Sequence, residues 1–153
     1  MKYLLILLVL ITLANAKQHL FMVNEYDKEI ELEAKMISKI SNSSVKGKVS
    51  VFIPKISLKE KQIYAKYFNL VQRCENANFV YDKQGFSHIN CQAKDKLFFT
   101  NNYKRLISNT QYYGAFFWNK SRPNIVFVKQ RLQQRNIELS DEYQQFIEDL
   151  DEL

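Results

Sequence analysis

Apolar residues recur at helical spacing in the first part of the chain. Over residues 25–41 they fall three or four positions apart with polar residues between them, and this period predicts an amphipathic helix. Asn24 is a suitable N-cap, and Glu31 and Lys35 are placed one turn apart as an ion pair. The positions that would face a core are Ile30, Ala34, Ile37 and Ile40.

A strand-like segment and a second helix signal follow. Residues 49–53 form a nearly continuous apolar run that ends at Pro54, which is typical of a buried strand. Ser57 and Glu60 have the spacing of a capping box, in which each side chain satisfies a free backbone donor of the other residue. We therefore expect a helix from 58 to about 68.

The alternation continues in the second half of the chain. Residues 78–81 and 96–100 are short apolar runs that predict strands. Asn102 is placed to cap a short helix over 103–108. The segment between the two runs contains Gly85 and favours neither helix nor strand.

Two long strands and a final helix complete the expected fold. Residues 112–118 and 124–128 are separated by five polar or turn-forming residues, a loop length common in hairpins. A last helix is predicted over 141–150, with Ser140 as its N-cap. Alternating helices and strands predict an α/β fold: a single, mostly parallel sheet covered by helices on both faces, with a carboxy-terminal antiparallel hairpin.

The first strand of the predicted hairpin is apolar on both faces. In GAFFW, Ala115 and Phe117 point to one side of the strand, and Phe116 and Trp118 point to the other. Strands of this kind occur where helices cover both sides of a sheet, so core packing explains most of these aromatic residues.

The turn of the hairpin carries the residues that we single out as a candidate binding site. Trp118 adjoins the polar turn, and its indole N–H needs a partner if it is buried. Lys120, Arg122 and Asn124 follow within six positions. Stacking and charge could hold a partner's loop or a small anionic or aromatic ligand there. The alternative is that Trp118 caps the core and the hairpin is purely structural.

The chain begins with the features of a secretory signal peptide. Residues 1–16 combine Lys2, an apolar stretch and a final Ala-Asn-Ala, which predicts cleavage before Lys17. The apolar stretch is short for a membrane span, although an uncleaved anchor is the alternative. Residues 17–153 then form a single α/β domain with an acidic carboxy-terminal helix, and export from a bacterium would place it in the periplasm.

The sequence contains two cysteines, Cys74 and Cys91. In an oxidising compartment such a pair normally forms a disulfide, and we predict one here. The alternative is a reactive thiol near His88, but no CxxC spacing is present to lower a thiol pKa.

Charge is distributed unevenly between the body of the chain and its end. Residues 17–135 contain 21 basic and 9 acidic residues, whereas seven acidic and no Lys or Arg residues follow Arg135. A basic body favours anionic partners or an intramolecular match with the acidic end. No known nucleic-acid-binding pattern is present, so we do not expect nucleic acid as a partner.

Sequence patterns of enzymes are not found. The chain has two histidines, His19 and His88, and neither a G-x-S-x-G elbow, zinc-ligand spacing, an EF-hand loop nor a nucleotide-binding loop, so we expect no catalysis, metal or cofactor. A carboxylate pair for glycoside hydrolysis remains an alternative, because spacing alone does not exclude it. Its members would be Glu138, Asp141 or Glu142.

Several segments together resemble the YfiR-like periplasmic regulators. They are VSVFIP, Cys74 ahead of ANFVYD, LFFTNN, and GAFFW followed by RPNIVFV and RLQQRNIEL. In that family a carboxy-terminal hairpin leads into a segment of basic, small and apolar residues, and residues 125–139 lie at the matching place. The resemblance covers most of the mature chain. It implies an exported α/β domain that binds a membrane-embedded signalling partner and holds it inactive, without catalysis.

We therefore expect an exported, non-catalytic binding module, a periplasmic regulator or sensor whose partner is a membrane or envelope protein. Two other functions remain open from the sequence. One is a structural accessory of an envelope machine, and the other is a hydrolase acting on envelope material.

Overall fold

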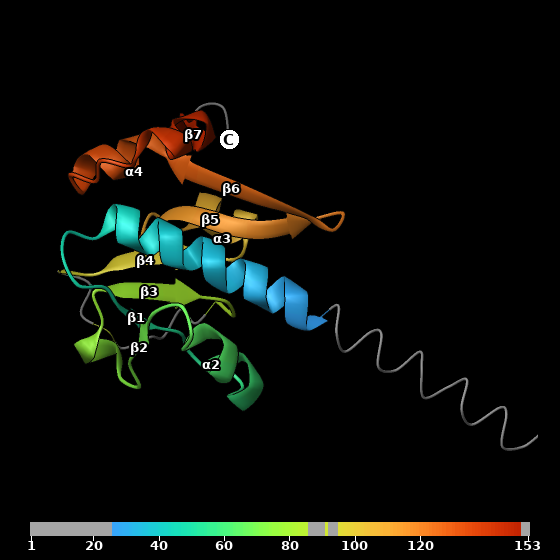
Figure 1. Ribbon diagram of the computed structural model, residues 1–153. Coiled ribbons are helices and arrows are strands. Elements are labelled where there is room, and N and C mark those ends of the chain that lie inside the picture. Colours follow the sequence, from blue (N-terminus) through green and yellow to red (C-terminus); the bar gives the residue numbers. More distant parts are fainter. Residues whose placement is uncertain (1–25, 86–90, 92–94, 151–153) are drawn as a thin grey trace, which may run out of the picture.

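The computed structural model describes residues 26–85, 91 and 95–150, which form one seven-stranded sheet with helices packed on both of its faces (Figure 1). The strand order is β2-β1-β3-β4-β5-β6-β7. Neighbouring strands are parallel except β5 and β6, which form an antiparallel hairpin. The predicted fold class is confirmed.

The strands are β1 (Ser50–Phe52), β2 (Asn69–Leu70), β3 (Phe79–Asp82), β4 (Leu97–Thr100), β5 (Tyr112–Asn119), β6 (Arg122–Val128) and β7 (Ile147–Glu148). The helices are an amino-terminal helix over residues 26–44, α2 (Leu58–Tyr64), α3 (Tyr103–Ser108) and α4 (Lys129–Gln134), with two 3-10 helices, η1 (Cys74–Asn76) and η3 (Asp141–Phe146).

The amino-terminal helix and α2 cover one face of the sheet, which we call the front face. The four apolar positions predicted to face the core, from Ile30 to Ile40, are all buried there. They pack with alternate residues of the strands, among them Phe79, Phe99 and Phe127. Phe99 lies at the centre of this layer, with its ring centroid 5.4 Å from that of Tyr113 and 5.9 Å from that of Phe127.

The opposite face, which we call the back face, is covered by α3 and η1. Leu106 of α3 and Cys74 of η1 pack there with Val80, Phe98 and Val126. Neighbouring residues of each central strand thus contribute to different apolar layers. This explains why the central strands are apolar at nearly every position.

Local signals in the sequence account for the helix starts. Ser57 Oγ accepts a hydrogen bond from the Glu60 backbone N–H at 3.2 Å, and Glu60 Oε2 accepts one from the Ser57 N–H at 3.1 Å, so the predicted capping box is confirmed. Asn102 Oδ1 accepts from the Arg105 N–H at 3.1 Å, as expected for the N-cap of α3. Both pairs satisfy backbone donors that the first turn of a helix leaves free.

The second helix is shorter than predicted. We expected it to continue to about residue 68, but α2 ends at Tyr64 and the chain returns to form β2 beside β1. Ser38 of the amino-terminal helix donates a hydrogen bond to the Tyr67 carbonyl oxygen at 2.9 Å, which fixes the turn. The two-residue β2 covers backbone groups of β1 that would otherwise be exposed at the sheet edge.

The end of the chain also differs from the prediction of an acidic helix over 141–150. Ser140 precedes the 3-10 helix η3 without making a side-chain capping bond, and β7 follows. Ile147 of β7 pairs with Phe127 of β6, and Tyr143 packs edge-on against the Phe127 ring. A regular helix would leave the edge of β6 unpaired, so pairing and burial outweigh local helix signals here.

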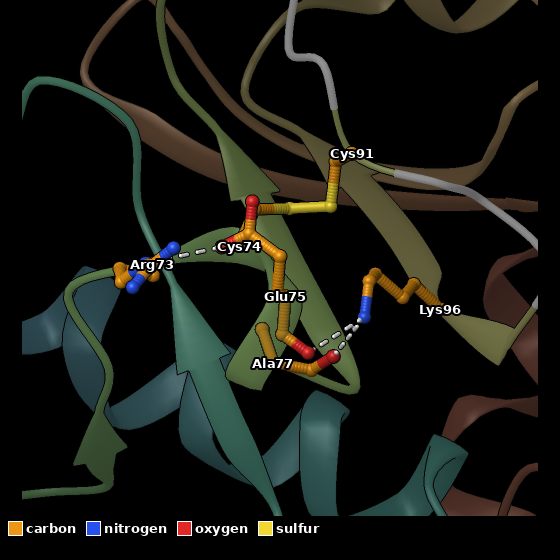
Figure 2. The surroundings of a disulfide bond; sticks show 6 residues. All are labelled: Arg73, Cys74, Glu75, Ala77, Cys91 and Lys96. Carbon is orange, nitrogen blue, oxygen red and sulfur yellow. Dashed lines mark hydrogen bonds and ion pairs between the residues drawn. A yellow bond between two sulfur atoms is a disulfide. The ribbon is translucent and has the colours of Figure 1, made fainter.

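A disulfide joins Cys74 to Cys91, whose Cα atoms are 5.7 Å apart (Figure 2). The pairing predicted from the sequence is confirmed, and a reactive thiol at either position is ruled out in this state. Close by, Lys96 Nζ donates to the carbonyl oxygens of Ala77 at 2.8 Å and Glu75 at 3.3 Å. A disulfide-bonded domain fits an exported protein.

Several predicted features lie outside the described residues. They are the signal peptide at 1–16, the N-cap Asn24, and both histidines, His19 and His88. Within residues 26–85, 91 and 95–150, none of the helices is both long enough and apolar enough to span a bilayer.

Candidate functional site

Four parallel strands, β1, β3, β4 and β5, end at the same edge of the sheet, which we call the carboxyl edge. Open α/β sheets bind ligands most often at this edge, near the point where successive connections turn in opposite directions. In this strand order that point lies between β1 and β3. The predicted hairpin turn lies at the same edge, after β5 (Figure 1).

The hairpin turn is tighter than expected. Asn119 pairs with Arg122, so the turn itself consists of Lys120 and Ser121 in place of the five-residue loop predicted from the sequence. Their φ angles are 47° and 60°. Positive φ at both central residues is typical of a type I′ turn, which favours Asn-Gly because other residues are strained there. Strain of this kind is common at functional sites.

The tip of the hairpin extends beyond the strands beside it (Figure 1). Pairing of β5 with β4 ends at Ala115, and pairing of β6 with β7 begins only at Phe127. Residues 116–119 and 122–125 therefore pair only with each other and form a two-stranded ribbon. Its reach beyond Ala115 is roughly 13 Å, taking about 3.3 Å per residue.

Trp118 lies on the front face of this ribbon and is half-buried. Its ring meets the Phe116 ring edge-on, with centroids 5.8 Å apart and an interplanar angle of 83°. Phe117 points to the back face, where its ring lies 5.4 Å from that of Tyr103. The opposite orientations of Phe116 and Phe117 agree with the alternation predicted from the sequence. Trp118 both caps the front core and presents part of its surface at the tip.

The structure brings Lys120, Arg122 and Asn124 together with a residue that the sequence did not single out, Asn119. These four side chains line an open hollow of about 510 Å³. Asn124 Nδ2 donates a hydrogen bond to the Arg122 carbonyl oxygen at 2.9 Å, which orients the amide. Two cations and two amides, with no carboxylate among the described lining residues, are suited to an anionic group.

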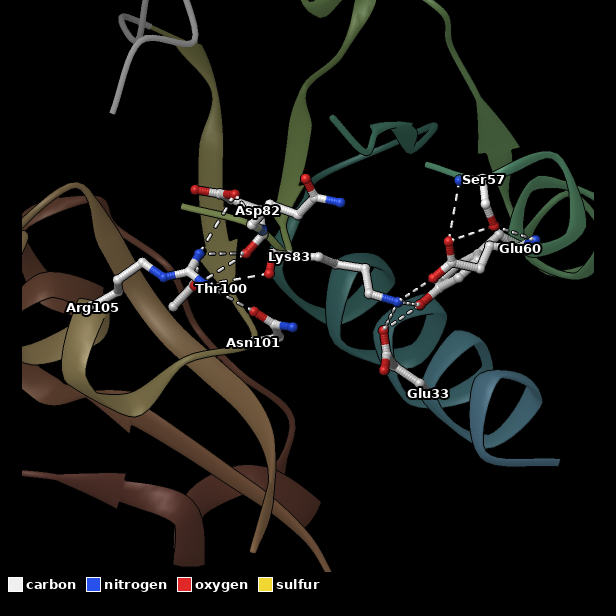
Figure 3. Close-up of polar contacts among 10 residues, drawn as sticks. Glu33, Ser57, Glu60, Asp82, Lys83, Thr100, Asn101 and Arg105 are labelled. Carbon is white, nitrogen blue, oxygen red and sulfur yellow. Dashed lines mark hydrogen bonds and ion pairs between the residues drawn. The ribbon is translucent and has the colours of Figure 1, made fainter. Parts of the chain in front are cut away.

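A second group of charged residues lies at the carboxyl edge and was not predicted. Lys83 follows β3, and its Nζ lies 2.9 Å from Glu33 Oε1 and 2.7 Å from Glu60 Oε1 (Figure 3). Tyr64 donates a short hydrogen bond to Glu33 and lies 3.3 Å from Lys83 Nζ. These residues come from three elements that are distant in sequence, so spacing alone does not reveal the group.

The environment of this group changes the pKa values of its members. Burial by itself lowers the pKa of Lys83, but the two carboxylates outweigh it and raise that pKa above its ordinary value. Burial likewise acts to raise the pKa of Glu60, yet hydrogen bonds from Lys83 and Ser57 bring it below its ordinary value. Burial and the nearby Glu33 raise the pKa of Tyr64 far above the physiological range. Lys83 and Glu60 thus stay charged and Tyr64 stays neutral at neutral pH.

Asp82, the last residue of β3, is fully buried on the other side of the strand. It accepts hydrogen bonds from the backbone N–H groups of Gln84 at 3.0 Å and Gly85 at 2.7 Å, and a short one from the Tyr112 hydroxyl. Arg105 Nη1 lies 3.6 Å from Asp82 Oδ1 (Figure 3). These contacts use both carboxylate oxygens to hold the chain as it leaves β3.

Arg105 fastens the ends of two neighbouring strands. Its Nη2 donates to the carbonyl oxygen of Lys83 at 3.2 Å and to Asn101 Oδ1 at 3.4 Å, and its Nη1 lies 3.4 Å from Thr100 Oγ1 (Figure 3). The side chains of Asp82, Lys83 and Arg105 are therefore all engaged in ion pairs. The cations of the hairpin tip are instead exposed.

The residues considered for a glycoside-hydrolysing acidic pair, Glu138, Asp141 and Glu142, are all exposed, and Ser140 Oγ lies 3.4 Å from Glu142 Oε1. Across the described part of the chain, no cluster of three or more His, Cys, Asp or Glu residues could hold a metal ion.

Comparisons with protein-family models, with curated proteins and with solved structures gave no match. The function must therefore be argued from the geometry of this chain.

Proposed function

We propose that the protein is an exported binding module whose hairpin tip contacts a membrane or envelope protein. The observation that carries this proposal is the tip itself: a ribbon that extends beyond the sheet, presents Lys120 and Arg122 at a hollow, and exposes part of Trp118 on its front face. Central Trp and Arg residues dominate many protein interfaces. The two-residue turn fixes the backbone from which these side chains extend, which reduces the entropy lost on binding.

Contact through side chains is favoured over the addition of a partner's strand. Pro123 lies in the exposed part of β6 and has no N–H to donate, and it is flanked by Arg122. Proline and charge at a strand edge protect it from pairing with other strands. The partner's contacting surface is accordingly expected to be acidic and to offer an apolar position to Trp118.

The resemblance to the YfiR-like regulators leads to a more specific form of the proposal. In that form the protein resides in the periplasm and holds a membrane-embedded signalling protein inactive. The hairpin near the carboxy-terminal end of the sheet supports this form, and the disulfide supports export. A small anionic ligand is the other binding partner that we consider for the tip. It would bind the same two cations, Lys120 and Arg122, and so compete with the partner protein.

Affinity capture from envelope extracts tests this function. The exported protein should retain a single inner-membrane protein, and Lys120→Ala with Arg122→Ala should weaken capture by about 2–4 kcal/mol, as central interface contacts do. Lys28→Ala with Lys39→Ala removes two exposed cations from the amino-terminal helix and is the matched control. Equal capture by both double variants would refute the role of the tip. Retention of a large assembly would favour a structural accessory.

A further inference from the structure

An exposed apolar and basic surface lies at the start of α2, away from the hairpin tip. We call it the α2 patch and define it by Tyr26, Ile56, Leu58, Lys55, Lys59 and Lys61. Leu58, the first residue of α2, is 82% exposed, and Tyr26 is 53% exposed. The residue of α2 that is buried in the core is Tyr64, so core packing does not account for Leu58.

An apolar hollow of about 360 Å³ adjoins Leu58. The hollow lies beyond the ends of β1 and β2, and Lys55 and Lys61 stand among its lining residues. None of the described lining residues is acidic. Its apolar members are Phe52, Ile53, Ile56, Leu58, Leu70 and Val71. The α2 patch is thus continuous with an apolar depression that has basic neighbours.

The acidic residues near the patch are already engaged. Lys59 Nζ lies 2.6 Å from Asp27 Oδ1 and 5.5 Å from the centre of the Tyr26 ring. Glu60, between the lysines in sequence, turns inward to Lys83. The three lysines of the patch and Asp27 together carry a formal charge of +2 (three minus one), which is complementary to an anionic surface.

The start of the amino-terminal helix lies beside α2. Asp27 touches Lys59 of α2, and this contact places Tyr26 next to the lysines of the patch. Apolar and basic residues side by side are the composition of surfaces that lie on membranes.

We propose that the α2 patch docks on the surface of an anionic lipid bilayer. Leu58 and Tyr26 would enter the interfacial region, where aliphatic and tyrosine side chains are both favourable, and the lysines would contact lipid phosphates. A single patch of this size gives reversible binding. Docking would turn the carboxyl edge, and with it the hairpin tip, toward the membrane.

Vesicle sedimentation tests the proposal with the protein in the form in which cells export it. Vesicles of 70% phosphatidylcholine and 30% phosphatidylglycerol should bind the protein at an ionic strength of about 0.1 M, where the Debye length is about 10 Å, and vesicles of phosphatidylcholine alone should bind it much less. Leu58→Glu with Lys61→Glu should lower the partition coefficient at least tenfold, since each lysine near an anionic surface contributes about fivefold. Glutamate is favourable in the first turn of a helix, so α2 should be retained, and circular dichroism would verify it.

Ile107→Glu with Lys48→Glu is the matched control, because it makes the same change of charge at exposed positions outside the patch. Its partition should stay within about twofold of the original protein, given that surface charge acts locally within a Debye length. Equal loss in both variants, or equal binding to neutral vesicles, would overturn the proposal. Partner capture in detergent does not require a bilayer, so it tests the hairpin function separately from lipid docking.

Discussion

Lys83 Nζ lies 2.9 Å from Glu33 Oε1, and this ion pair joins strand β3 to the amino-terminal helix. Glu60 of α2 binds the same ammonium group at 2.7 Å. One cation thus connects three elements of the front face. The Lys83 side chain is 17% exposed, so water screens these contacts only partly.

The first prediction concerns the loss of this cation. Lys83→Met keeps most of the side-chain volume but leaves the carboxylates of Glu33 and Glu60 close together without the cation between them, so the free energy of unfolding should fall by about 3–5 kcal/mol. Urea denaturation would measure it. Lys35→Met breaks the exposed pair with Glu31 and should leave the stability nearly unchanged. Similar small losses in both variants would mean that the Lys83 contacts are not important for stability.

The pH dependence of stability follows from the same group. The pKa of Glu60 is lowered in the folded protein from its ordinary value of 4.5, so its contribution is present above that value and is lost as pH falls through the lower folded pKa. The pKa of Lys83 is raised above 10.5, so its contribution is present below pH 10.5 and is lost as pH rises through the higher folded pKa. Thermal unfolding measured over a range of pH should therefore show a melting temperature that falls on both the acid and the alkaline side, and we call these two sides the acid and alkaline flanks.

Lys83→Met should weaken the acid flank of this profile. Without the cation, burial continues to raise the pKa of Glu60 and only the hydrogen bonds from Ser57 still lower it. The folded-state pKa of Glu60 then lies closer to its ordinary value or above it, so stability should fall less as pH decreases toward 4 than it does in the original protein. An unchanged acid flank in the variant would show that Lys83 does not control Glu60.

A third prediction concerns Gly114, where close packing excludes a side chain. A Cβ added there would lie 2.6 Å from Phe99 Cε2 and 2.9 Å from the Val126 carbonyl oxygen. Gly114→Ala should therefore destabilise the fold by about 3 kcal/mol, near the upper range for overpacking. At Gly47 a Cβ would meet nothing within 4 Å and only its φ of 90° opposes it, so Gly47→Ala should cost about 1 kcal/mol. Equal losses of stability in the two variants would show that close packing against Phe99 and Val126 is not what excludes a side chain at Gly114.

A fourth prediction concerns the disulfide. In denaturant without reductant, neither Cys74 nor Cys91 should react with a maleimide, and after reduction both should react, which mass spectrometry would detect. Reduction should lower the stability by about 3 kcal/mol, the usual effect for a loop of this length. Rapid labelling before reduction would refute the bond.

Much of the fold could be predicted because its residues act locally. The capping residues Ser57 and Asn102 and the apolar stripe of the amino-terminal helix determine their elements through near neighbours, and the structure confirms them. The strands β2 and β7 were missed, since their pairing depends on β1 and β6, which lie far away in sequence. A strand of two residues is also too short to show a periodic pattern of apolar positions.

The candidate site divides in the same way. The hairpin residues Lys120, Arg122 and Asn124 are close in sequence and could be grouped in advance, and the structure places them around one hollow. The Lys83 group joins residues from three elements and could not be found before the topology was known. Arg131 is a further example, because its burial against the carbonyl oxygens of Leu106 and Tyr112 depends on how α4 packs.

The last prediction separates the strain of the hairpin turn from its role in binding. Ser121 has a φ of 60°, a conformation that costs a non-glycine residue about 1 kcal/mol. Ser121→Gly removes this strain at the second position of a type I′ turn, where glycine is preferred, and should raise the free energy of unfolding by about 0.5–1 kcal/mol. The variant keeps Lys120, Arg122 and Trp118, so partner capture should remain within about twofold if these side chains carry the binding energy. A marked loss of capture by the more stable variant would instead show that the partner contacts Ser121 or requires the original shape of the turn.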